Sequence, residues 1–78
     1  MKTERKKSIP ESVKLLGNNI ARIIEEKGLL RRTVAHDADL DVENLRKYIS
    51  GKQIMGVHIL FRLAKALDVS VEELCREI

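Results

Sequence analysis

The sequence predicts an all-α domain of five short helices, and three observations support that expectation. Apolar residues recur at three- and four-residue intervals along most of the chain. Gly28, Asp39 and Gly51 follow the first three of these segments, and both residue types tolerate the left-handed backbone that ends a helix. No stretch alternates apolar and polar residues in the manner of a half-buried strand. A chain of 78 residues has room for one such domain.

The first predicted helix opens at Ser8 and closes at Gly28. Ser8 can act as the N-cap, Glu11 can reach back to it, and Pro10 fits a first helical turn. One apolar stripe then follows helical spacing, with Lys27 next on the same face: Val13, Leu16, Ile20, Ile23 and Ile24.

Two shorter helices follow the first. We expect one over Arg31–Ala38, with a narrow inner face made of Val34, Ala35 and Ala38. Asp39 to Asp41 then forms a tight turn, and Asp41 is a good N-cap for the next helix. That helix runs from about Val42 to Ser50 and turns three residues toward the core: Leu45, Tyr48 and Ile49.

The sequence after residue 50 predicts a loop and two more helices. Residues 51–56 form the loop, and a fourth helix covers Val57–Leu67 with four residues inward: Leu60, Leu63, Ala64 and Leu67. Ser70 and Glu73 repeat the capping-box pattern. They open a short fifth helix that ends near Glu77.

Charge separates a basic tail from a neutral domain. Residues 1–7 hold four basic residues and one acid, while the remainder holds eleven of each sign. We therefore divide the chain into a flexible basic N-terminal arm, residues 1–8, and a folded domain, residues 9–78. The arm is either a solubilising tail or a contact for phosphates or the minor groove. Any basic surface on the domain itself must arise from segregated charge.

Composition excludes several classes of protein. Cys75 is the only cysteine, so no disulfide forms within the chain. No signal peptide or membrane-length apolar run is present, and we expect the cytoplasm of a bacterial or phage-infected cell. His36, His58 and Cys75 match no zinc spacing, and no catalytic motif occurs. We expect no enzyme activity, cofactor, metal or small-molecule substrate.

The second and third predicted helices, joined by a turn of about three residues, form a unit suited to reading DNA. The second helix of such a unit needs an apolar face to anchor it and a polar face to reach base edges and phosphates. Opposite Leu45, Tyr48 and Ile49, the third helix presents a different set: Val42, Glu43, Arg46, Lys47 and Ser50. A helix of this size fits the major groove, where each base pair shows a distinct pattern.

Four stretches in order carry a family resemblance: IARIIEEKGL at 20–29, Val34-Ala35, DVENLRKYISGK at 41–52 and LFRLAKALDVSVEEL at 60–74. Through them, residues 15–75 resemble the lambda-repressor-like, or Cro/XRE, helix-turn-helix family. The resemblance implies a five-helix DNA-binding domain that binds double-stranded DNA as a transcriptional regulator. A homodimer of this kind, acting as a repressor, reads a palindromic operator through its third helix.

The resemblance also implies roles for particular positions. Base-reading positions of the family fall on Val42, Glu43, Asn44 and Lys47. The expected phosphate contacts are Arg31, Arg32, Arg46 and Lys52. Ser50 lies on the same exposed helix face.

The segment from Ile54 to Phe61 is unusually apolar for a loop and a helix start. It either packs locally or forms an exposed patch for dimerisation. We expect a dimer interface at Ile54, Met55 and Ile59, because the inner face of the fourth helix is already occupied by Leu60 and Leu63. A rival function keeps the same fold: an antitoxin or anti-regulator that binds another protein through this patch. The near-neutral domain favours that rival.

Overall fold

Helices form where the apolar spacing predicts them. The computed structural model describes residues 9–78, which fold into five helices without a strand. Their bounds are α1 (Glu11–Glu26), α2 (Arg31–Asp37), α3 (Val42–Ile49), α4 (Val57–Leu67) and α5 (Val71–Leu74). The expected all-α class is confirmed, and each expected helix is present within a few residues of its predicted bounds.

Each of the first four helices ends in the same hydrogen-bonded motif. The left-handed residues are Gly28, Asp39, Gly51 and Asp68, with φ of 66°, 60°, 73° and 59°. The next amide in each case donates to a carbonyl five residues back, as Leu29 does to Ile24 at 3.0 Å and Lys52 to Lys47 at 2.9 Å. Gly28, Asp39 and Gly51 therefore end helices as predicted, and Asp68 does so as well.

The helix starts differ more from expectation. Ser8 lies outside the described residues, and Pro10 is the N-cap of α1 without a side-chain bond. Asp41 occupies the N-cap of α3, but its side chain accepts no cap hydrogen bond. Ser70 does cap α5, since its Oγ accepts the Glu73 amide at 3.0 Å. The helix α5 ends at Leu74, earlier than predicted.

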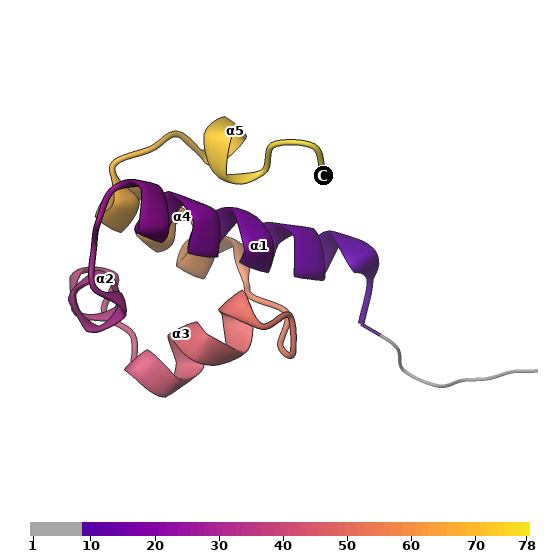
Figure 1. Cartoon of the computed structure of the whole chain (residues 1–78). Coiled ribbons are helices and arrows are strands. Elements are labelled where there is room, and N and C mark those ends of the chain that lie inside the picture. Colours follow the sequence, from indigo (N-terminus) through magenta and orange to yellow (C-terminus); the bar gives the residue numbers. More distant parts are fainter. Residues whose placement is uncertain (1–8) are drawn as a thin grey trace, which may run out of the picture.

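The long helix α1 lies between α5 on one side and α3 on the other (Figure 1). The second helix packs against α3 and α4, and α5 packs against α4 and α1. The core draws on all five helices: Ile20, Ile23, Ile24, Val34, Ala35, Ala38, Leu45, Tyr48, Ile59, Leu63, Ala64, Leu67 and Leu74. This arrangement leaves one side of α3 without a covering helix in the described chain.

The placement of Ile59 corrects one sequence-based expectation. We expected it on an exposed patch, but only 9% of Ile59 is exposed and it belongs to the core. The core-facing side of α4 includes Ile59 as well as Leu63 and Leu67, so it is wider than the sequence pattern predicted. Leu60 is half-buried and packs against the core, whereas Ile59 is a full member of it. Ile59 therefore has little surface to offer a second subunit.

Candidate nucleic-acid interface

The third helix has one buried face and one open face. Leu45 is fully buried and Tyr48 nearly so, and Ile49 is half-buried beside them. Five residues of α3 and its C-cap are exposed: Val42, Glu43, Arg46, Lys47 and Ser50. The apolar face fixes the helix on α1 and α2, so the polar face is presented on a supported rod.

Six of the residues expected to contact DNA line one open groove of about 410 Å³. Its lining consists of Arg31, Glu43, Arg46, Lys47, Ile49, Ser50 and Lys52. Arg31 comes from the first turn of α2, whereas the others come from α3 and the loop after it. The packing of α2 on α3 thus brings together side chains that are up to 21 positions apart in the sequence.

Cations dominate this groove. It holds four of them, Arg31, Arg46, Lys47 and Lys52, against the single acid Glu43. Glu43 is paired with Arg46, with 3.5 Å between Oε2 and Nη1, and both side chains are largely exposed. An exposed pair of this kind is weak and readily exchanged for another partner. The groove is thus a cationic surface with donors that suit phosphate oxygens and base edges.

Three of the expected DNA-contacting residues lie outside the groove. Arg32 is exposed on α2, and Val42 is 37% exposed at the start of α3. Asn44 is half-buried and faces a separate hollow on the other side of α3. The structure therefore separates the nine expected residues into a cluster of six and three outlying positions.

The hollow beside Asn44 has the opposite charge. The lining comes from the end of α2, the turn after it and the start of α3: His36, Asp39, Leu40, Asp41 and Asn44. Asp39 also approaches Arg62 of α4, with 3.8 Å between Oδ2 and Nη1. The charges of the domain are therefore segregated along α3, acidic at its start and basic at its end.

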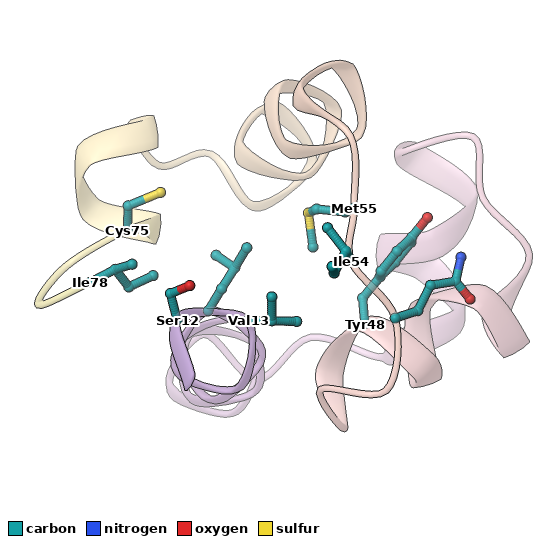
Figure 2. A pocket seen from close by; sticks show the side chains of 9 residues that line it. Ser12, Val13, Tyr48, Ile54, Met55, Cys75 and Ile78 are labelled. Carbon is teal, nitrogen blue, oxygen red and sulfur yellow. The ribbon is translucent and has the colours of Figure 1, made fainter. Parts of the chain in front are cut away.

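An apolar pocket of about 140 Å³ lies away from the groove, between α1, the loop after α3 and the C-terminal segment (Figure 2). Val13, Met55 and Cys75 approach it from these three segments (Figure 2). Ile54 at its edge is 61% exposed, and Val57 and Phe61 on α4 are 65% and 56% exposed. We call Ile54, Val57 and Phe61 the apolar stripe; Met55 is half-buried beside it.

Residues 9–78 also bear on metal binding and on membrane insertion. In this part of the chain, no three His, Cys, Asp or Glu side chains converge as metal ligands would. None of the described helices has the length and apolar character needed to cross a membrane.

The fold and the groove together define a small helix-turn-helix domain, with α2 and α3 as its two helices. A family model described as "Helix-turn-helix" matches residues 20–74. The chain belongs to this Cro/XRE-like helix-turn-helix family of DNA-binding transcriptional regulators. The resemblance seen in the sequence is thereby confirmed. No curated protein matches the chain.

Two solved structures share the fold. One is the restriction-modification controller protein C.AhdI from Aeromonas hydrophila, with a TM-score of 0.76 and 28% identity. The match covers 82% of this chain and 96% of that one. The other is the clp gene regulator ClgR from Corynebacterium glutamicum, with a TM-score of 0.80 and 21% identity, covering 86% of this chain and 71% of that one.

Proposed function

We propose that this protein is a sequence-specific regulator that lays the exposed face of α3 in the major groove of double-stranded DNA. The observation that carries the proposal is the single groove that gathers six polar or charged side chains from α2, α3 and the following loop. A protein described as a restriction-modification controller shares the fold at 28% identity, which also favours a regulatory role.

Within this proposal, some residues in and beside the groove contact base edges, and the others contact phosphates. Lys47 donates to guanine O6 or N7, and Glu43 accepts from cytosine N4. Val42, at the start of α3, packs on a thymine methyl group. The remaining cations hold the DNA backbone: Arg31, Arg32, Arg46 and Lys52.

We propose further that the protein acts as a homodimer. Val57 and Phe61 are four residues apart on α4 and therefore share one side of the helix, and exposed Ile54 lies in the loop just before it. In a two-fold symmetric dimer, the apolar stripe of one subunit would be buried against the apolar stripe of the other. Half-buried Met55 lies beside the stripe. Two copies of α3 spaced by about 34 Å then read a palindromic operator, and occupancy of that operator in the cytoplasm represses transcription.

A selection from a random duplex pool tests the DNA-binding part. The purified protein is expected to enrich one motif with two-fold symmetry, and its affinity for that motif is expected to fall steeply with added salt. Enrichment of no motif would contradict sequence-specific binding. Capture of one defined protein by the same sample, lost on Phe61→Lys, would then favour the antitoxin or anti-regulator function.

Sedimentation equilibrium tests the dimer. The wild-type protein is expected at twice its monomer mass, and Phe61→Lys is expected to shift it to the monomer by placing a charge in the apolar stripe. Asn18→Lys is the matched control, because it introduces the same charge at an exposed position on α1, outside the stripe. A monomeric wild-type protein, or a dimer unchanged by Phe61→Lys, would contradict this interface.

A further inference from the structure

The first helix approaches the end of α3 more closely than side chains permit. Gly17 is buried in the middle of α1, although glycine is a poor residue for a helix interior. A Cβ atom at this position would lie 2.6 Å from the carbonyl oxygen of Tyr48, and it would also overlap the carbonyl oxygen of Ile49. Because the obstacle is backbone, no change of rotamer relieves it.

A second close approach lies one turn earlier on α1. A Cβ atom on Gly51, the left-handed residue after α3, would meet Lys14 Cα at 3.2 Å and Lys14 Cγ at 2.9 Å. Gly17 and Lys14 therefore hold the same end of α3 at two adjacent points. We call the contacts of Gly17 with Tyr48 and Ile49, and of Lys14 with Gly51, the α1 clamp. Both clamp residues precede residues 20–74, the part matched by the family model.

The clamped backbone is the backbone that carries the DNA-facing cations. The Tyr48 carbonyl touched by Gly17 accepts the Gly51 amide at 3.1 Å, and the Lys47 carbonyl accepts the Lys52 amide at 2.9 Å. Lys47 and Lys52 both line the cationic groove. Any movement of this turn therefore shifts two groove cations relative to Arg31, which is held separately on α2.

We propose that Gly17 is a positioning residue that sets where the C-terminal end of α3 meets DNA. Gly17 thereby determines the preference of the protein for its specific sequence, and not its affinity for DNA of any sequence. This inference rests on the proposed DNA-binding function and adds a determinant outside the recognition helix. A methyl group at position 17 requires the last turn of α3 to move by at least about 0.8 Å, since the Tyr48 oxygen must go from 2.6 Å to an ordinary 3.4 Å and the Ile49 oxygen would lie closer still. Binding constellations tolerate only about 0.5 Å of misplacement.

The experiment compares Gly17→Ala with Gly56→Ala, a matched change at a glycine where the nearest side-chain atom would lie at an unstrained 3.4 Å. Each variant is titrated with the motif selected by the wild-type protein and with a scrambled duplex of equal length. Gly17→Ala is expected to lower the ratio of specific to scrambled affinity by roughly 10-fold, comparable to one mismatched base pair. Gly56→Ala is expected to leave that ratio within about twofold.

The affinity for the scrambled duplex distinguishes a displaced α3 from an unfolded protein. This affinity depends on charge, and Gly17→Ala changes no charge. The affinity of a folded Gly17→Ala protein for the scrambled duplex is therefore expected to stay within about twofold of the wild-type value. A folded Gly17→Ala protein with an unchanged ratio would overturn the inference. If the wild-type protein selects no motif, the proposed sequence-specific DNA binding is wrong. The experiment therefore distinguishes failure of the proposed function from failure of the inference about Gly17.

A second variant keeps the test decisive if Gly17→Ala does not fold. Lys14→Gly loosens the other half of the α1 clamp, and Asn18→Gly is its control, since Asn18 is exposed on the same helix and its replacement by glycine also lowers helix propensity. Lys14→Gly is expected to lower the specificity ratio at least about fivefold more than Asn18→Gly, whereas loss of a charge alone lowers both affinities together. Equal ratios in these two variants would overturn the inference.

Discussion

The two ends of α3 differ in both charge and support. At its C-terminal end, Lys47 and Lys52 share a groove with Arg31, and α1 packs tightly against the backbone. At its N-terminal end, Asp39 and Asp41 line a hollow, and no side chain caps the first turn. The same eight-residue helix thus joins a basic, well-supported end to an acidic, uncapped one.

We expect this difference to make side-chain charge outweigh the helix dipole in placing the DNA backbone. A helix N-terminus ordinarily attracts phosphate, because its free amides and its dipole favour negative charge. Here Asp39 and Asp41 stand at that end and oppose it, whereas four groove cations surround the C-terminal end. We therefore expect phosphates to lie beside Arg31 and Lys52, and base contacts to be made by Val42, Glu43 and Lys47 of α3.

The largest effect is expected from removing both groove cations assigned to phosphate. Arg31→Ala combined with Lys52→Ala should weaken binding by roughly 100-fold on specific and scrambled DNA alike, since each charged hydrogen bond contributes about 1.5 kcal/mol. The slope of log K against log salt should become shallower by about 2. Fluorescence anisotropy across a salt series measures both quantities. A loss confined to the specific duplex would show that these residues read bases.

An intermediate effect is expected from Lys47→Ala. Loss of a base-edge contact should weaken binding to the selected motif by about 10-fold and relax the preference at one base pair, since such contacts discriminate by about 1–3 kcal/mol. Repeating the selection with this variant measures the change position by position. If the preference stays intact at every position while affinity falls on all sequences, Lys47 is a phosphate contact and the division of the groove is wrong.

The smallest effect is expected at the acidic end. Asp39→Asn should raise affinity about twofold on all duplexes, because it removes an exposed negative charge just before α3 that repels phosphate. Asparagine also tolerates the left-handed φ of 60°, so the turn keeps its shape. Anisotropy at low and high salt measures the gain, which should shrink as salt rises. A loss of affinity would mean that Asp39 supports binding, through its contact with Arg62 or otherwise.

Local sequence signals predicted most of the fold because the physical cause of each element lies within a few residues. Helical spacing of apolar residues located the helices, and Gly28, Asp39 and Gly51 ended three of them through the conformations these residues tolerate. The end of α5 was misjudged, because the capping signal at Ser70 fixes where that helix starts and not how far it continues.

Features that depend on distant segments were not predicted. Ile59 was expected at the surface because its burial depends on how the other helices enclose α4. The contact of Gly17 with α3 likewise joins residues more than 30 positions apart, and only a glycine inside an otherwise regular helix signals it. Lys27 is a third case, since its Nζ donates to the Leu67 carbonyl at 2.8 Å and satisfies the end of α4.

The sequence predicted which residues belong to the candidate site. Only the structure showed which of them line the same groove and which lie apart from it. Sequence spacing placed Glu43, Arg46 and Lys47 on one helix face. It did not separate Asn44, which lies 100° farther around α3 than Glu43 and faces the acidic hollow instead. The joining of Arg31 to this face depends on the packing of α2 against α3, which a one-dimensional pattern does not specify.

The most direct test of DNA binding through the basic end of α3 is amide chemical-shift mapping during titration with the selected duplex. We predict the largest shifts at Arg31 and along residues 43–52, with smaller shifts around Asp39. Shifts concentrated instead at Ile54, Val57 and Phe61, with the groove unperturbed, would contradict the account.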